Sequence, residues 1–511
     1  MGFIDSIVNE LNNETKLTEN GAVAYRTSGK KLLDLNFAVA SLRRASEQEI
    51  INKFMGAYFE DKVVTIKWLF YARDVREGLG ERRLFRLTME EFTKQEPKAA
   101  KELIKLIPEY GRWDDLWCLL ETDLVDDVVK LVQIQLKEDF NNMLENKSVS
   151  LLSKWMPSLN ASSEITKKYA SILCKKMGDT PRNYRKFLSK MRKYIDVVEC
   201  KMSAKEWNAI NYETVPSRAN LIYNNAFLRN DEERRREYLS KLEKGEVKIN
   251  AGTLYPHDIV HKYGYSRNVD TTLEGLWKAL PDTVKGCGNT IVVADGSGSM
   301  DCNVGGNVTA LDVANALAIY FAERSSGEFK DKYITFSERP QLVDFSNAKN
   351  LRDKLMIARQ HDEVANTNIE AVFDLILSTA IKNNMSQEEI PANILIVSDM
   401  EFDSCATTNS SRSNGWYSYC KRPTTTLFGE IKKRYKAAGY KLPRLVFWNV
   451  NSRTGTIPVK ENDLGVALVS GFSVNIVNMV MSNKTDPYEC LLETLNTERY
   501  QPIEDAIKDI V

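Results

Sequence analysis

Hydrophobic residues recur at helical spacing through residues 15–280. This spacing of three and four predicts a succession of amphipathic helices. The predicted helices cover residues 62–71, 81–94, 99–107, 123–145, 165–176, 182–199 and 231–244. Turn residues separate them, for example at Gly78-Leu79-Gly80 and Asp179-Thr180-Pro181. Many helices with few strands indicate an α-solenoid or bundle, and because no strict repeat is visible, any helical repeat is degenerate.

The pattern changes after Gly286-Cys287-Gly288, where short apolar runs begin to alternate with helices. The predicted strands are residues 290–294, 332–336, 394–397, 445–450 and 465–469, and the predicted helices are 309–325, 369–382 and 424–438. Such alternation is typical of a doubly wound, mostly parallel α/β sheet. We therefore expect a helical domain over residues 1–284, an α/β domain over 285–480, and a helical segment over 481–511 that packs back on the first domain.

Composition adds limits to this picture. The 511 residues are too many for one hydrophobic core. Lys+Arg and Asp+Glu are equal at 70 each, so only the distribution of charge can indicate a nucleic-acid partner. The 8 cysteines form no C-x-x-C pair, which favours a reducing compartment over a disulfide framework or a zinc site. No apolar run is long enough for a membrane span and no signal-peptide core is visible, so a cytoplasmic protein is expected.

The strongest chemical signal is Asp295-Gly296-Ser297-Gly298-Ser299, directly after the first apolar strand. One carboxylate and two hydroxyls on a tight turn are the hard oxygen ligands that Mg²⁺ and Ca²⁺ take. Thr367 opens a later helix and Asp399 follows another buried strand. Because the carboxyl ends of parallel strands meet at one edge of a sheet, Asp295 and Asp399 are expected to lie together.

In this order, Asp295, Ser297, Ser299, Thr367 and Asp399 resemble the metal-ion-dependent adhesion site of von Willebrand factor A domains. The resemblance implies a doubly wound α/β domain that holds Mg²⁺, or another divalent cation such as Ca²⁺ or Mn²⁺. It also implies an open coordination position for an acidic residue of a protein partner. Glu401 and Asp403 could face the site, but we expect both to be ordinary solvated loop carboxylates.

A basic stretch lies in the helical part, where residues 151–250 carry 21 Lys/Arg against 12 Asp/Glu. Its densest portion is one predicted helix with Arg182, Arg185, Lys186, Lys190, Arg192 and Lys193. All of these except Arg192 fall at same-face spacing. Tyr184 and Tyr194 interleave and could stack on unpaired bases. An RNA-binding face is one interpretation, although charge alone favours a solvated helix face.

Several phrases of the helical part resemble the TROVE domain, an RNA-binding module of Ro-type proteins. They are Arg76-Glu77-Gly78-Leu79-Gly80-Glu81-Arg82, Tyr110-Gly111-Arg112-Trp113-Asp114-Asp115-Leu116 and Lys154-Trp155-Met156-Pro157-Ser158. The resemblance implies a ring or solenoid of HEAT-like helical repeats followed by a von Willebrand A domain. Phrases such as Lys205-Glu206-Trp207 indicate a divergent bacterial and phage branch, for which the small RNA partners of Ro proteins cannot be assumed. Arg73, Arg76, Arg82 and Arg83 could serve RNA, but we favour a structural role in which they pair with Asp74, Glu77 and Glu81 and join adjacent helices.

No P-loop, dinucleotide-binding fingerprint, H-E-x-x-H or nucleophile elbow occurs, so no enzymatic activity is expected. The leading interpretation is a non-catalytic RNA-binding protein of Ro-like type. It would bind single-stranded RNA ends and small or misfolded structured RNA, with a metal-dependent von Willebrand A domain for partner docking. Two alternatives stay open: a metal-dependent protein-interaction scaffold without RNA binding, and a structural, virion-associated protein if the chain is phage-encoded.

Overall fold

The computed structural model describes residues 15–264, 266–284, 289–336, 339–362, 368–403, 427–458, 465–476, 479, 484 and 486–511. The chain forms two compact units. The α/β unit is built from Met1–Ser46, Tyr255–Asp270 and Pro281–Thr494, and the helical unit from Glu47–Leu254, Thr271–Leu280 and Leu495–Val511. The units therefore follow the chain less simply than the division predicted at residues 284 and 480.

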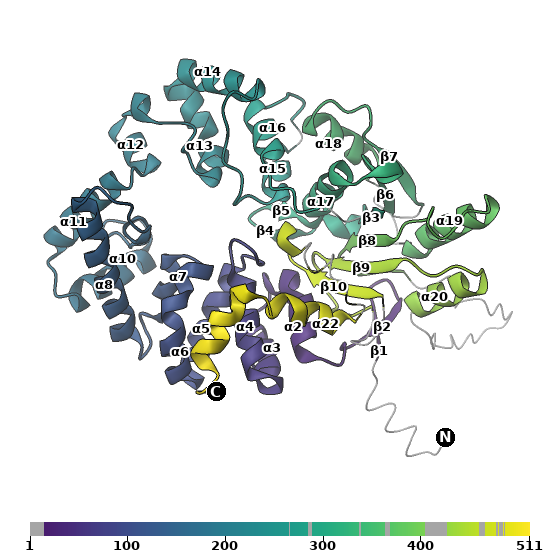
Figure 1. Ribbon diagram of the computed structural model, residues 1–511, viewed down its shortest axis with the longest axis horizontal. Helices are drawn as coiled ribbons and strands as arrows, with labels where there is room; N and C mark the ends of the chain where they lie inside the picture. The colour runs from purple at the N-terminus through teal and green to yellow at the C-terminus, as the bar shows by residue number, and fades with distance from the viewer. Residues whose placement is uncertain are drawn as a thin grey trace, which may run out of the picture. The chain divides into compact units, whose positions relative to one another are not determined.

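The α/β unit contains a six-stranded sheet of order β10-β9-β8-β3-β6-β7 (Figure 1). The strands are β3 (Thr290–Asp295), β6 (Lys332–Phe336), β7 (Gln341–Asp344), β8 (Asn393–Ser398), β9 (Arg444–Asn449) and β10 (Val466–Ser470). All neighbours are parallel except β7, which pairs antiparallel with β6. The five predicted strands are confirmed, whereas β7 was not predicted because its sequence has no apolar run.

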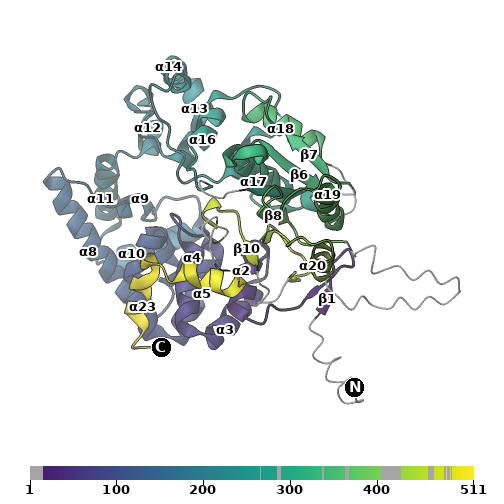
Figure 2. The same cartoon turned by 45° about the vertical axis from the view of Figure 1, so that its right-hand side comes forward.

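Helices cover both faces of this sheet, which explains the continuous apolar runs of its strands. Every residue of β3 is buried. On β9, Phe447 packs edge-on against Phe428 of helix α20, while the next residue, Trp448, packs against Phe321 of helix α17. Figure 2 shows α17 beside β6 and β8. The helices of the unit are α2 (Lys31–Leu42), α15 (Pro256–Tyr263), α17 (Ala310–Arg324), α18 (Leu351–Gln360), α19 (Ile369–Lys382), α20 (Leu427–Ala437) and α22 (Pro487–Leu495).

The start of the described chain belongs to this sheet and not to the helical unit. A hairpin of β1 (Thr15–Leu17) and β2 (Val23–Tyr25) precedes α2, which packs on β9 and β10. Asn449 donates its side-chain N–H to the carbonyl of Phe37 at 2.8 Å, and the backbone N–H of Ala40 donates to Ser470 Oγ at 3.0 Å. Buried polar contacts of this kind make residues 15–46 a structural part of the α/β unit.

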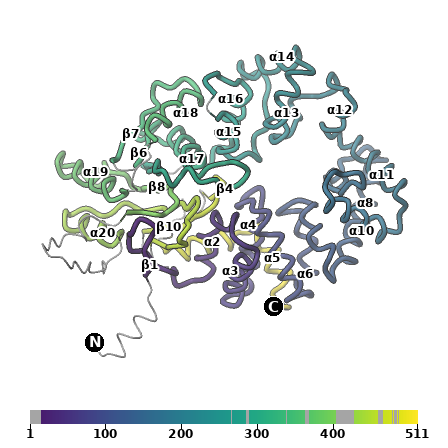
Figure 3. The backbone as a smooth tube through the Cα atoms, turned by 180° about the vertical axis from the view of Figure 1, so that it is seen from behind, coloured from purple at the N-terminus to yellow at the C-terminus, as the bar shows by residue number. Residues whose placement is uncertain are grey.

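The helical unit is made of helices that mostly pack on their neighbours in sequence, a pattern typical of α-helical repeats. Its helices are α3 (Glu47–Glu60), α4 (Lys62–Arg73), α5 (Arg82–Gln95), α6 (Pro97–Leu103), α7 (Ile107–Tyr110), α8 (Val125–Leu144), α9 (Leu152–Trp155), α10 (Glu164–Lys176), α11 (Pro181–Tyr194), α12 (Val198–Ala204), α13 (Ser217–Asn230), α14 (Glu232–Glu243), α16 (Thr271–Lys278) and α23 (Gln501–Ile507). Figure 3 shows α8, α10 and α11 side by side. In the part of the chain that the structure describes, none of the helices has the length and apolarity needed for a membrane span.

Buried ion pairs connect the helices around the loop that follows α4. Arg73 is buried and contacts Asp115 Oδ2 through Nη2 at 2.7 Å. Arg86 Nε contacts the other oxygen of Asp115 at 2.8 Å, and Arg82 pairs with Asp114 at 2.8 Å. The structural role expected for Arg73 and Arg82 is therefore confirmed, but their partners are Asp114 and Asp115 and not the predicted Asp74, Glu77 and Glu81.

The last helix, α23, packs on α4 and α6, and its approach is fixed by the buried carboxylate of Asp74. Arg499 donates to both carboxylate oxygens, Tyr500 donates its hydroxyl at 3.1 Å, and the backbone N–H of Arg76 donates at 2.9 Å. The C-terminal segment is thus held by charge-assisted hydrogen bonds, which are the stronger class in proteins.

We expect Asp74→Ala to destabilise the helical unit by about 3–5 kcal/mol, because it leaves the Arg499 guanidinium without its main partner. Urea unfolding followed by circular dichroism measures the change. The matched control is Glu77→Ala, since Glu77 is 61% exposed and lies 3.9 Å from the same guanidinium. Its effect should stay within about 1 kcal/mol, and equal losses for the two variants would contradict the role assigned to Asp74.

Candidate metal centre and basic surface

The carboxyl ends of β3 and β8 bring together two of the predicted metal ligands. Asp295 ends β3, and Asp399 follows the last residue of β8. Ser398 donates its hydroxyl to Asp295 Oδ2 at 2.6 Å, which ties the two strand ends together. Asp295 is 1% exposed and Asp399 is 0% exposed. The sheet edge therefore holds two buried acids side by side, as the parallel-strand rule predicted.

The serines of the motif lie at the same edge. The backbone N–H of Ser297 donates to Asp295 Oδ1 at 3.0 Å, and the Ser297 and Ser299 hydroxyls are 3.0 Å apart. Ser297 is buried while Ser299 is partly exposed, so the hydroxyl pair leads from the buried acids toward solvent. The fifth predicted ligand, Thr367, lies outside the described residues.

The electrostatics of this edge favour a bound cation. Burial raises the pKa of Asp295, and burial together with the negative charge of Asp295 raises the pKa of Asp399 to about 7. Arg453 pairs with this edge: its Nη2 lies 3.5 Å from Asp399 Oδ2 and 2.7 Å from Glu19 Oε2, and its side chain is 41% exposed. Because Arg453 is partly exposed and shared with Glu19, it offsets only part of the charge of the two buried carboxylates, and a cation at this edge would offset the rest.

The donor set fits a hard divalent cation, because two carboxylates and two hydroxyls supply only oxygen ligands. No group of three or more His, Cys, Asp or Glu side chains suitable for a metal occurs among the described residues. The candidate centre does not need one, since half of its ligands are hydroxyls. Gly296 serves the turn by allowing close approach: a Cβ there would lie 2.9 Å from Thr335 Oγ1 on β6.

Asp362 is a third acid at this turn that the sequence interpretation missed. It follows α18, and its Cα would be 3.6 Å from a Cβ on Gly296. Asn315 of α17 donates to Asp362 Oδ2 at 3.1 Å, and burial raises the pKa of Asp362 to about 6. It lies outside the five-residue motif, so only its position just ahead of the Thr367 loop could have drawn attention to it.

The expectation that Glu401 is a solvated loop carboxylate is wrong. Glu401 is 0% exposed. Its Oε1 accepts hydrogen bonds from the backbone N–H groups of Arg453 and Thr454, both at 2.8 Å, and its Oε2 accepts one from the backbone N–H of Glu19 at 2.8 Å. The Thr454 hydroxyl lies 2.9 Å from both oxygens. Glu401 therefore joins the loop after β8, the loop after β9 and the N-terminal hairpin.

The predicted basic helix is α11, which has one buried apolar side and one exposed basic side. Tyr184, Leu188 and Met191 are buried. The opposite side carries the exposed cations Arg182, Arg185, Lys186, Lys190 and Lys193, none of which makes an ion pair with a described residue. Lys190 lies over the ring of Phe140, 5.0 Å from its centroid.

Two residues assigned to this surface have other roles. Arg192 donates hydrogen bonds to the carbonyls of Ser153 and Met156 and to Ser158 Oγ, at 2.9, 2.6 and 2.9 Å. Its guanidinium therefore binds α9 and the loop that follows it. Arg192 is therefore held in place by the loop after α9, and its place on an RNA-binding face stays a prediction. Tyr184 cannot stack on a base either, because it is 2% exposed and donates its hydroxyl to the carbonyl of Pro157.

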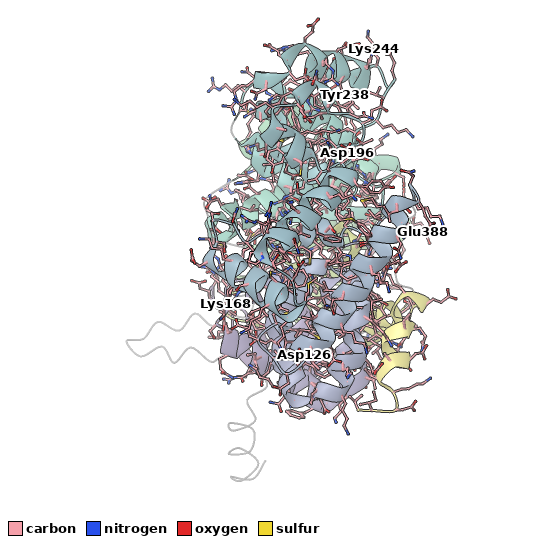
Figure 4. All side chains as sticks on the ribbon, turned by 90° about the vertical axis from the view of Figure 1, so that its left-hand side faces the viewer. Asp126, Lys168, Asp196, Tyr238, Lys244 and Glu388 are labelled. Carbon is pink, nitrogen blue, oxygen red and sulfur yellow. The ribbon has the colours of Figure 1, made fainter. Side chains whose placement is uncertain are left out.

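A groove of about 590 Å³ runs along α11 and α12. Its cationic lining residues are Arg185, Arg192, Lys193 and Lys201. Asp196, labelled in Figure 4, also lines it and pairs with Lys201 at 2.7 Å. Glu206 is a second acid in its lining, so the groove is a polar concavity of mixed charge in which Arg185 and Lys193 make no ion pair with a described residue.

Comparison with known proteins places the chain in a family. The model "Domain of unknown function (DUF2828)" matches residues 18–129 and 122–289. The chain belongs to the DUF2828 family. A second model, "Domain of unknown function (DUF7788)", matches residues 289–506, the region that contains the candidate metal centre. The boundary between the two models falls just before β3.

A curated relative of this DUF2828 protein is the uncharacterized protein L728 of Acanthamoeba polyphaga mimivirus. It is 30% identical over 526 aligned positions, which cover 95% of this chain and 88% of the relative. Among solved structures, the Ro (RSR) protein of Deinococcus radiodurans covers 89% of this chain and 92% of its own, with 13% identity and a TM-score of 0.39. A likeness at that TM-score is too loose to bear on function, so the TROVE and von Willebrand A resemblances stay predictions.

We expect Glu401→Gln to lower the stability of the α/β unit of this DUF2828 protein by about 1–3 kcal/mol, since the new amide N–H₂ would face backbone donors. Thermal melting measures the loss, and limited proteolysis should cut the N-terminal segment faster. The control is Glu388→Gln on an exposed loop, where Glu388 is labelled in Figure 4. Equal melting temperatures for both variants would contradict the bridging role of Glu401.

Proposed function

We propose that the protein is a non-catalytic RNA-binding protein whose α/β unit docks a protein partner through a divalent cation. The observation that carries the RNA part is the exposed face of α11, where five cations lie without ion pairs beside a polar groove. Unpaired basic side chains along a helix face are the electrostatic feature that phosphate binding requires.

The TROVE-like phrases of the sequence add support of a different kind. They run through the region from α4 to α9, the same unit that carries α11. In this proposal α11 contacts the phosphates of single-stranded ends or small structured RNA. Tyr194, which is partly exposed, is the aromatic residue available next to the cations.

The docking part of the proposal rests on the buried pair of Asp295 and Asp399 with the Ser297 and Ser299 hydroxyls. In this proposal these four side chains hold Mg²⁺ or a similar cation, and Thr367 completes the set as the sequence predicts. A bound cation supplies an open position for an acidic group, because the protein ligands carry only two negative charges. The chain's own part is to keep both carboxylates buried and tied to the strand ends.

A second function, a metal-dependent interaction scaffold without RNA binding, is favoured by the same acid pair. It requires nothing of α11, whose exposed cations would then be only a solvated helix face. The two functions separate in the experiments below, because one depends on α11 and the other on the sheet edge.

We expect a 3′-tailed RNA to bind the full chain with an affinity that falls about a hundredfold between about 50 and 200 mM salt, as five phosphate contacts predict. The triple variant R185E/K186E/K190E should lose most of this binding. The slope of log affinity against log salt should become less steep by about 2. Fluorescence anisotropy measures both quantities.

The control for this experiment is K94E/K105E/K241E, which changes the same net charge at exposed lysines that are ion-paired in the helical unit. It should keep the wild-type affinity. Absence of binding at low salt, or equal losses in the two triple variants, would refute the RNA function and leave the interaction scaffold.

For the metal centre, we expect saturating Mg²⁺ to raise the melting temperature by about 5–10 °C at pH 8, the gain for a ligand near 100 times its Kd. The gain should shrink at pH 5.5. The raised pKa of about 7 leaves Asp399 protonated there, and the proton competes with the ion for the same oxygens. Asp399→Asn should abolish the gain, whereas Glu388→Gln should keep it. A gain that is independent of pH, or intact in Asp399→Asn, would place the ion elsewhere.

A further inference from the structure

A second concavity of the α/β unit lies at the opposite edge of the sheet, where β9 and β10 begin. Its volume is about 450 Å³, a size common for small-molecule sites. Leu445 of β9 and Val466 of β10 form part of its wall, and α20 forms another. We call it the lysine pocket, after Lys432, Lys436 and Lys441 in its lining.

Within the described residues, nothing compensates the charge of the lysine pocket. No acidic residue occurs among the described residues that line it. Lys432, Lys436 and Lys441 are exposed, and none makes an ion pair within the described part of the chain. Lys432 and Lys436 are one helical turn apart, a spacing at which like charges destabilise a helix.

The other cations of α20 behave differently, which makes this arrangement specific. Lys433 pairs with Glu430 at 2.8 Å, and Arg434 pairs with Asp374 at 2.7 Å. Neither residue lines the pocket. The helix therefore neutralises the cations that point elsewhere and leaves unneutralised the two that face the concavity.

The walls of the pocket are apolar and fixed in place. Phe428 and Pro443 contribute apolar surface, and Tyr25 and Tyr440 contribute rings. The Tyr440 hydroxyl lies 2.9 Å from the carbonyl of Met385, and the backbone of Tyr25 exchanges two hydrogen bonds with Ile457, at 2.8 and 2.9 Å. An apolar, partly aromatic wall beside three cations suits a ligand with a flat ring at one end and anionic charge at the other.

We propose that the lysine pocket binds a mononucleotide, with the base against the apolar wall and the phosphates among the three lysines. Lysine is a common phosphate ligand because its ammonium acts as a compact charge. The volume suits a small ligand, whereas an acidic peptide or an RNA strand would need a longer groove. This site is independent of the metal centre and of α11, and nothing in the proposed function requires it.

Isothermal titration of the full chain with ATP, in EDTA to exclude the metal centre, tests the proposal. We expect ATP to bind more tightly than AMP, and both adenosine and pyrophosphate to bind more weakly than ATP. The variant K432E/K436E should lose about tenfold or more in ATP affinity, the worth of a lost charged contact. K432Q/K436Q should show a smaller loss in the same direction, and it serves where charge reversal disturbs folding.

The matched control is Lys433→Glu on the same helix, which should keep the affinity of the parent for ATP. Unchanged ATP binding in K432Q/K436Q would overturn the site. Pyrophosphate binding as tight as ATP would overturn the nucleotide assignment, because the apolar wall would then contribute nothing. Binding of an RNA oligomer or a polyglutamate peptide at this site without ATP binding would overturn it in favour of a polymer. These outcomes are independent of the RNA-binding and Mg²⁺-binding results, because the variants leave α11 and the metal centre unchanged.

Discussion

The hydrogen bonds gathered by Glu401 are the constraint on which the carboxyl edge of the sheet depends. Glu401 lies two residues after Asp399. Its side chain accepts hydrogen bonds from the N-terminal hairpin and from the loop after β9. A buried carboxylate is costly unless its oxygens are satisfied, so the three segments must be present together. Without these hydrogen bonds the loop that begins at Asp399 would be free to move, and the position of Asp399 relative to Asp295 would no longer be fixed. The candidate metal centre therefore rests on a residue that is not one of its ligands.

The periodicity of apolar residues predicted the helices that bury one apolar face and the strands that are apolar along their whole length. The strands at Thr290 and Ile394 were found because both of their faces are covered, and the proximity of Asp295 and Asp399 followed from the direction of those strands. The assignment of α2 to the sheet could not be predicted, because an amphipathic pattern says that a face is buried and not against what. The prediction for Glu401 failed for a related reason, because a glutamate in a loop is usually solvated. Its hydrogen-bond donors come from residues 19, 453 and 454, which are far away in the sequence.

The basic helix shows the same division between local and tertiary information. Helical spacing alone separates Arg185, Lys186 and Lys190 from the buried side, and the structure agrees. Arg192 was included for its charge, although its spacing places it off the exposed face. Its three hydrogen bonds to the loop after α9 agree with that spacing. Net charge of a segment thus overstates the number of free cations, while the helical period sorts them.

The pairing of α2 with β9 and β10 also constrains the order in which the molecule can be completed. Phe37 and Asn449 are 412 residues apart in the chain. At synthesis rates of about 5–20 residues per second, the hairpin and α2 wait about 20–80 s for the strands they cover. During that time the apolar side of α2 has no native partner, and a nascent chain in this state is a substrate for chaperones. The α/β unit is therefore completed only after β9 and β10 have been synthesised, when α2 can pack on them.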